Sequence, residues 1–279
     1  MNLIEDKNVR ERIRKDLLNL VDFTLSDKDT GSSLKILLEH FNVSVENFKS
    51  EVLAYNLGKG IDGYENNNYQ KIAARLALHF HNIIKGSYHI KRQEVIASFL
   101  GQVKPNNFID VGYGVPAPYL FSYMKENSFA HAVLADQDSS AEEFAQQLII
   151  SIDEDFLSRV SFKTYDMDTE NYVGDTDTYL YLDSIEHTKN PTEYLRRVVF
   201  KARSRSYFIF SLPICSMKGM ENFHFIEWLT NIDAKTWLEQ AGLRILSEDE
   251  VFPNPSVDYF AELIEGGYHN YLVLAQKER

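Results

Sequence analysis

Acidic, hydroxyl and imidazole side chains follow directly after short apolar segments in the second part of the sequence, where they could bind a ligand or move a proton. The first segment, residues 108–111, includes Asp110 and runs into Gly112-Tyr113-Gly114. Two glycines one residue apart allow a tight turn and a close approach of the backbone to a ligand. A carboxylate beside this turn would repel a pyrophosphate and attract an ammonium group. The alternative is a purely structural turn between a strand and a helix.

The second apolar segment, residues 132–135, is followed by Asp136, Gln137 and Asp138. An acidic side chain at this distance from the glycine turn is placed to accept hydrogen bonds from a ribose diol. The alternative role is a cap on the next helix, which Asp138 or Ser139 could provide. That leaves Asp136 as the better candidate for a ligand.

The third apolar segment, residues 160–165, ends at Asp166 and Met167. A carboxylate with a polarizable neighbour could hold the amine and the flat face of an adenine. The alternative is structural, because aspartate also caps helices and closes turns.

The fourth apolar segment, residues 178–182, leads into Asp183 and Ser184 and then into Glu186 and His187. A glutamate and a histidine in the loop after a buried strand put two proton-transfer groups at one place. His187 could instead orient the loop or Glu186. Proton transfer and orientation both remain open for this histidine.

These positions share one structural requirement, a parallel sheet whose strands all end at the same edge. Strand-like segments alternate with helical patterns, which predicts an α/β sheet with helices on both faces. The last two segments have no clear helix between them, which predicts an antiparallel strand at the end of the sheet. In such a sheet, ligands bind beyond the carboxyl ends of the strands. The predicted strands are 108–111, 132–135, 160–165, 178–182, 207–212, 243–251 and 271–275.

The first hundred residues have a different pattern. Apolar side chains recur there at helical spacing, and no strand-like alternation interrupts them. We therefore predict two regions, a helical region over 1–104 and a sheet domain over 105–279. His79 and His81 could be read as a pair of metal ligands, but residues two apart on a helix point in different directions. A structural role is the better interpretation of this pair.

The composition narrows the class of protein. Of 279 residues, 41 are acidic and 29 are basic, which gives a formal net charge of −12. Phosphate binding needs clustered lysine and arginine, so this balance works against a nucleic acid partner. The single cysteine, Cys215, excludes an internal disulfide and a zinc site built from several cysteines. We expect no metal site.

No secretory leader is recognisable in the sequence. The longest strongly apolar stretch lies near residues 207–215 and has about half the length needed to cross a bilayer. We therefore expect a cytoplasmic protein with no membrane partner.

The ordered set of segments resembles the class I S-adenosylmethionine-dependent methyltransferases, in particular their small-molecule branch. The resemblance extends from about Asn107 to the C-terminus and implies a Rossmann-like, seven-stranded, mostly parallel sheet. It departs from the family at Pro116, where many members have a third glycine. The segments that carry it are Phe108-Ile109-Asp110-Val111-Gly112-Tyr113-Gly114, Asp136, Asp166-Met167, Ile185-Glu186-His187 followed by Pro191, Phe223-His224-Phe225-Ile226-Glu227-Trp228, and Trp237-Leu238-Glu239-Gln240-Ala241-Gly242-Leu243.

The resemblance implies S-adenosyl-L-methionine as the cofactor. Asp110 and the glycine turn with Tyr113 would face its methionine part, and Asp136 with Gln137 would face the ribose. The remaining implied contacts are Asp166 with the adenine amine, Met167 with the adenine ring, and Asp183 and Ser184 with the region near the sulfonium.

The resemblance also implies methyl transfer to an oxygen or nitrogen of a small-molecule acceptor. Such an acceptor needs a base near its proton. His187 and His224 are the first candidates, and Glu186 is the next; the alternative for His224 is a packed histidine in an aromatic segment. The helical region would form a lid over the acceptor, with contacts from Tyr55, Tyr64, Tyr69, Tyr88 and His89.

Two other functions remain open, a cofactor-binding partner or regulator that has lost catalysis, and a methyltransferase that acts on protein or RNA. The acidic charge disfavours the RNA acceptor. A homodimer remains open as an oligomeric state.

Overall fold

The computed structural model describes the chain except residues 1–6, 58–70, 171–172, 216–223, 260–266 and 279. Tyr64 and Tyr69, two of the expected lid residues, lie outside the described residues. The first part of the chain is helical, as predicted. Its helices are α1 (Lys7–Ser26), α2 (Gly31–His40), α3 (Val45–Leu57), α4 (Ile72–Ile83) and α5 (Tyr88–Val103).

A seven-stranded sheet follows, with the strand order β3-β2-β1-β4-β5-β7-β6. Strands β1 to β5 are parallel, and β7 pairs antiparallel with both β5 and β6. This confirms the predicted sheet and its antiparallel last strand. The strands are β1 (Asn107–Val111), β2 (His131–Asp136), β3 (Val160–Thr164), β4 (Thr178–Leu182), β5 (Tyr207–Ile214), β6 (Leu243–Val251) and β7 (His269–Lys277).

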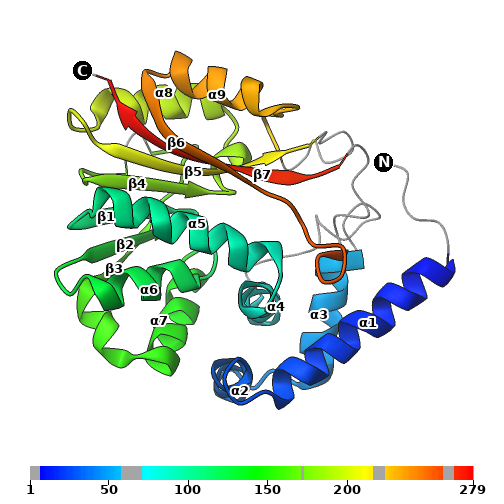
Figure 1. Cartoon of the computed structure of the whole chain (residues 1–279). Coiled ribbons are helices and arrows are strands. Elements are labelled where there is room, and N and C mark those ends of the chain that lie inside the picture. Colours follow the sequence, from blue (N-terminus) through cyan, green and yellow to red (C-terminus); the bar gives the residue numbers. More distant parts are fainter. Residues whose placement is uncertain (1–6, 58–70, 171–172, 216–223, 260–266, 279) are drawn as a thin grey trace.

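Helices cover both faces of the sheet (Figure 1). Side chains of α5, α6 (Pro118–Glu126) and α7 (Ser140–Ile152) form one core with one face of the central strands. Side chains of α8 (Pro191–Lys201) and α9 (Asn231–Gln240) form a second core with the other face. The central strands are buried on both faces, which explains why their sequences read as continuous apolar runs.

Helix α5 packs as part of the sheet domain. Its buried Ile96, Phe99 and Leu100 belong to the same core as Phe108 of β1 and Leu120 of α6. Helix α5 therefore contributes to the core of the sheet domain, although it precedes the predicted boundary at residue 104. The domain division itself stays a prediction.

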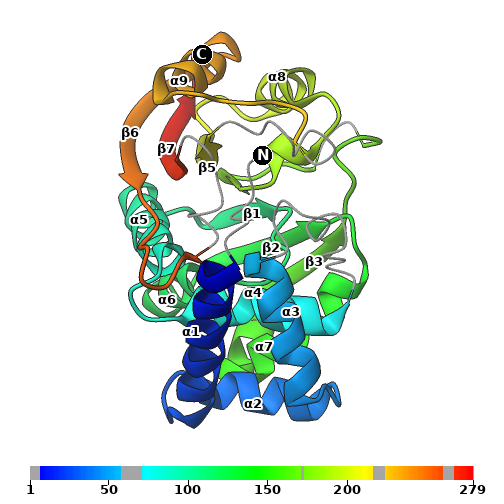
Figure 2. The same ribbon diagram turned by 90° about the vertical axis from the view of Figure 1, so that its right-hand side faces the viewer.

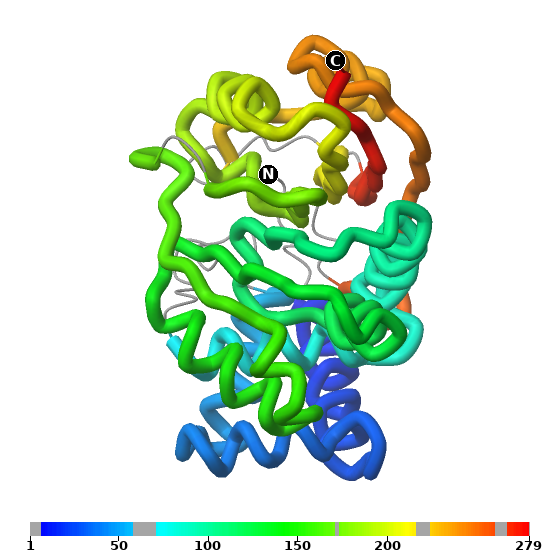
Figure 3. The backbone as a smooth tube through the Cα atoms, turned by 90° about the vertical axis from the view of Figure 1, so that its left-hand side faces the viewer, coloured from blue at the N-terminus to red at the C-terminus, as the bar shows by residue number. Residues whose placement is uncertain are grey.

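Helices α1 to α4 share their own apolar core with α7 (Figures 2 and 3). Phe144 of α7 is fully buried in this core and stacks on Phe41, with ring centroids 5.7 Å apart. The core also includes Phe80 of α4 and Val115, just after the glycine turn. The helical region is thus packed directly against the loops at the carboxyl ends of β1 and β2. None of the helices described here is long and apolar enough to cross a membrane.

Candidate functional site

The glycine turn after β1 has the conformation that its sequence predicts. Gly112 and Gly114 have φ angles of +73° and +56°, in the left-handed region that favours glycine. The Gly112 N–H donates a 2.7 Å hydrogen bond to the carbonyl of Ala135. A Cβ atom on Gly112 would lie 2.6 Å from the Cβ of Ser184. The turn therefore lies directly against the loop after β4.

Asp136 holds the loop after β2 to the same turn. Its Oδ2 accepts a 3.0 Å hydrogen bond from the Gly114 N–H, and its Oδ1 accepts a 2.9 Å bond from the Asp138 N–H. Burial raises the pKa of Asp136 despite these two bonds. Gln137 is exposed. Asp136 thus bonds the glycine turn and also lies at the carboxyl end of β2, where a ligand would bind.

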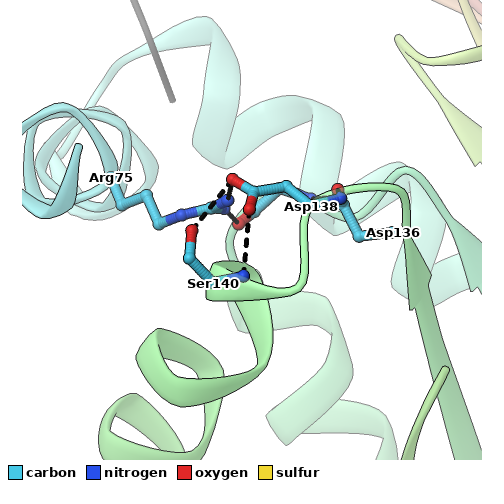
Figure 4. Close-up of polar contacts among 5 residues, drawn as sticks. Arg75, Asp136, Asp138 and Ser140 are labelled. Atoms are coloured by element: carbon cyan, nitrogen blue, oxygen red, sulfur yellow. Dashed lines mark hydrogen bonds and ion pairs between the residues drawn. The ribbon is translucent and has the colours of Figure 1, made fainter. Parts of the chain in front are cut away.

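Arg75 of α4 joins the helical region to these loops (Figure 4). The side chain is 1% exposed, and its guanidinium lies 2.5 Å from Oδ2 of Asp138. It also donates to the carbonyl oxygen of Gly114. Sequence reasoning missed this residue; the available signal was a lone arginine within the apolar run of α4.

Asp138 bonds the first residue of helix α7, close to the capping role that is its alternative. Its carboxylate accepts 2.9 Å bonds from the backbone N–H and the hydroxyl of Ser140. Burial acts to raise the pKa of Asp138, but the bonds from Ser140 and Arg75 outweigh it and hold the pKa below its ordinary value.

Asp110 is a buried acid near the carboxyl end of β1, two residues before Gly112. It is 3% exposed, and burial raises its pKa to about 7 although a hydrogen bond from Tyr119 opposes this shift. The Tyr119 hydroxyl donates to Oδ2. Oδ1 has no hydrogen-bond partner among the described residues.

Asp183, after β4, is held from three other elements. Its Oδ1 accepts bonds from the Ser211 hydroxyl at 2.8 Å and from the Asn270 side-chain amide at 2.7 Å. Its Oδ2 forms an ion pair with Arg92 of α5. Its φ of +52° is a strained conformation for a residue with a side chain, and these contacts hold it there. Sequence reasoning missed Arg92 and Asn270.

Glu186 lies in the single turn of 3-10 helix, Ile185–His187, that follows Asp183 and Ser184. It is 1% exposed, and neither carboxylate oxygen has a hydrogen-bond partner among the described residues. Burial raises its pKa, and the charge of Arg92 opposes that shift. Ser184 is also buried, and its hydroxyl has no hydrogen-bond partner within the described part of the chain.

The three predicted catalytic residues lie together. The Nε2 atom of His187 is 4.0 Å from Oε1 of Glu186. The His187 and His224 rings meet edge to face, with centroids 4.6 Å apart. The Phe225 N–H donates a 2.8 Å hydrogen bond to the Glu186 carbonyl, which brings His224 to this loop from a distant part of the sequence.

Asp166 and Met167 lie in the loop after β3. The Asp166 carboxylate accepts bonds from the Asp168 N–H at 2.8 Å and from the Thr169 hydroxyl at 3.0 Å, so it closes a local turn. Met167 is half-buried and packs against the core. Asp168 accepts 2.7 Å bonds from the Thr188 hydroxyl and the Lys189 N–H, which ties this loop to the one after β4.

A small polar hollow lies at the carboxyl ends of β2 and β3, beside the glycine turn. Its lining residues are Tyr113, Asp136, Asp138, Ser139, Glu142, Phe162, Lys163 and Thr164.

Known structures share this fold. An O-methyltransferase family protein from Burkholderia thailandensis superposes with a TM-score of 0.55 at 14% identity, over 91% of this chain and 74% of its own. The N-methyltransferase NodS from Bradyrhizobium japonicum, in complex with S-adenosyl-L-homocysteine, gives 0.51 at 10% identity, over 69% and 88%. The [4+2]-cyclase SpnF gives 0.54 at 12% identity, over 70% and 83%.

The chain has the fold of the class I S-adenosylmethionine-dependent methyltransferases. No family model and no curated protein matches its sequence. At these identities the likeness concerns the fold alone, and the SpnF example shows that proteins of this fold are named for more than one activity. In a methyltransferase-like fold the polar residues described above occupy the ligand-binding end of the sheet.

The contact between Gly112 and Ser184 gives a first prediction. We expect Gly112→Ala to lower the free energy of unfolding by about 2 kcal/mol or more, because the new Cβ meets Ser184 and the φ angle is positive. The matched control is Gly101→Ala on α5, where a Cβ meets nothing within 4 Å and helix propensity favours alanine. Urea unfolding measures both. Partial rescue by Ser184→Gly is expected, and a loss for Gly101→Ala as large as that for Gly112→Ala would contradict the prediction.

The Arg75 contacts give a second prediction. We expect Arg75→Met to lower the free energy of unfolding by about 3 kcal/mol, because a buried guanidinium is lost while Asp138 and the Gly114 carbonyl remain. Arg203→Met is the control, since Arg203 pairs with Asp175 at 3.8 Å with both side chains more than half exposed. That surface change is expected to cost under about 1 kcal/mol. Equal losses in urea unfolding would show that burial of Arg75 does not matter.

Proposed function

We propose that the protein transfers a methyl group from S-adenosyl-L-methionine to an oxygen or nitrogen of a small-molecule acceptor. The observation that carries the proposal is Asp110, a buried carboxyl beside a turn of two left-handed glycines, with one oxygen that has no hydrogen-bond partner among the residues described. A buried acid in that state suits a ligand that brings an ammonium group and no pyrophosphate to the turn.

The polar atoms around the turn fit the proposed cofactor. Oδ1 of Asp110 and the Ser184 hydroxyl are buried and lack hydrogen-bond partners among the described residues, so both have capacity to bond a ligand. Asp136 lies at the end of β2, where it would accept bonds from the ribose hydroxyls. In this proposal Asp166 and Met167 contact the adenine from the loop after β3.

The hollow beside the turn has no room for even a water-sized molecule, whereas small-molecule pockets usually measure roughly 300–1,000 Å³. A ligand can bind there only if a lining side chain moves. Tyr113 lines this hollow and is 9% exposed. We therefore expect Tyr113 to move when the cofactor binds and to close over it afterwards.

The sulfonium of the cofactor supplies a methyl group with its own leaving group. The protein's task is then to align the acceptor and to exclude water. A hydroxyl or ammonium acceptor must also lose a proton. In this proposal His187, which is 35% exposed and lies next to Glu186 and His224, takes that proton, and His224 is the second candidate.

Calorimetry with S-adenosyl-L-methionine and S-adenosyl-L-homocysteine tests the proposal. We expect saturable binding of one molecule per chain. The absence of any binding heat up to about 1 mM ligand, the range of weak affinity, would contradict the proposal. Asp136→Ala is expected to weaken binding by about tenfold or more, the effect of losing about 1.4 kcal/mol of contact to the ribose. Asp153→Ala is the control, because Asp153 is exposed and its carboxylate accepts a bond from the nearby Asp155 N–H, away from the glycine turn. Binding without methyl transfer to any hydroxyl or amine acceptor in a broad panel would indicate the inactive, regulatory alternative.

The pKa of Asp110 gives a prediction for pH. In the free protein this carboxyl is mostly protonated at pH 6 and mostly ionised at pH 8, because burial raises its pKa to about 7. The ammonium group of S-adenosyl-L-homocysteine favours the ionised carboxylate, so affinity for this ligand is expected to rise about tenfold from pH 6 to pH 8. Asp110→Asn removes the titrating group and is expected to flatten this profile. An unchanged slope in that variant would show that another group is responsible.

A further inference from the structure

Three side chains that commonly bind metal ions converge beside the loop after β4. Each of Glu186, His187 and His224 offers a ligand atom, and these atoms all lie within 4.8 Å of one another. We infer that this cluster binds a divalent transition-metal ion such as Zn²⁺. The inference goes beyond the proposed function and does not depend on it, because the ion would bind whether or not the chain transfers methyl groups.

The distances suit one shared ion. Zinc lies about 2.0–2.2 Å from imidazole nitrogens and carboxylate oxygens, so two ligand atoms on one ion lie roughly 3–4 Å apart. Oε1 of Glu186 and Nε2 of His187 are already 4.0 Å apart. The imidazoles of His187 and His224 are nearly perpendicular, at 82°, with centroids 4.6 Å apart. All three ligand atoms lie within 4.8 Å of one another, so binding one ion requires them to move somewhat closer together.

Glu186 provides an independent indication of a cation. It is 1% exposed, and both carboxylate oxygens lack hydrogen-bond partners among the described residues. A buried carboxylate is costly unless it is paired or coordinates a metal. The charge of Arg92 reaches Glu186, but that guanidinium is committed to an ion pair with Asp183.

The backbone holds the three residues in place. Glu186 and His187 share one turn of 3-10 helix. The segment with His224 is fixed by the Phe225 bond to the Glu186 carbonyl, and the bridge between Ile214 and Trp228 joins it to the end of β5. Ligands carried on two segments that are bonded to each other need little reorganisation to bind an ion.

The ligand set selects the class of ion. Two imidazoles and one carboxylate suit Zn²⁺, Co²⁺ or Ni²⁺ better than Mg²⁺ or Ca²⁺, which prefer oxygen ligands. Three protein ligands leave a position open for water or for an oxygen of the acceptor. An ion there would lower the pKa of a bound hydroxyl, and His187 and His224 would then act as ligands in place of a free base.

Metal binding can be measured without any assay of activity. The full chain is treated with a chelator, dialysed against Zn²⁺ or Co²⁺, and analysed for metal content and for the visible absorption of bound Co²⁺. We expect one ion per chain, with affinity reduced at least tenfold in Glu186→Gln, His187→Gln and His224→Gln. His131→Gln is the control, because His131 lies on β2 and contacts Ser161. Circular dichroism verifies that each variant is folded.

Two outcomes would overturn the inference. One is less than stoichiometric metal in the unaltered chain, and the other is equal affinity in the control and in the three cluster variants. Calorimetry with S-adenosyl-L-homocysteine on the metal-loaded and metal-free chain separates the two proposals. Metal binding without cofactor binding refutes only the proposed function, and cofactor binding without metal binding refutes only this inference.

Discussion

One buried guanidinium connects the two parts of the molecule. Arg75 extends from α4 of the helical region and reaches both the Gly114 carbonyl and Asp138. Asp138 bonds the first residue of α7, and its N–H donates to Asp136, which also accepts the Gly114 N–H. The glycine turn, the loop after β2 and the helical region therefore form a single bonded unit. A ligand that opens this turn has to work against the buried ion pair, which is costly to break in a low-dielectric environment.

A second arginine organises the opposite side of the site. Arg92 pairs with Asp183, while its charge also acts on Asp110 and Glu186. Asp183 holds a strained backbone conformation in which its carboxylate also bonds β5 and β7. The guanidinium of Arg92 is thus paired mainly with Asp183. Asp110 and Glu186 remain buried acids whose compensation is incomplete, and this is the state that a bound cation would relieve.

The sequence allowed the sheet and the positions of its acidic residues to be predicted, because both depend on local signals. The predicted bounds of β4, 178–182, match the observed strand, and the left-handed turn at Gly112 follows from its residue types. Arg75, Arg92 and Asn270 could not be found in this way, because their partners are remote in sequence and only the fold brings them together. Asp166 shows a different limit. The same side chain can close a turn or bind a ligand, and its type does not distinguish these roles.

The two incompletely compensated acids differ in what surrounds them, and this difference argues for two different cations. Asp110 keeps one oxygen bonded to Tyr119, and the other oxygen lies beside a backbone turn without a hydrogen-bond partner among the described residues, so it can accept a directional bond from an ammonium group. Glu186 lies beside two imidazoles, and a neutral imidazole nitrogen offers a lone pair that a metal ion can use. An ammonium group would gain little from a second and third nitrogen at that distance, whereas a metal ion gains a bond from each. The ion pair of Arg92 with Asp183 adds a fixed positive charge that acts on both acids, so neither cation can bind without opposing it.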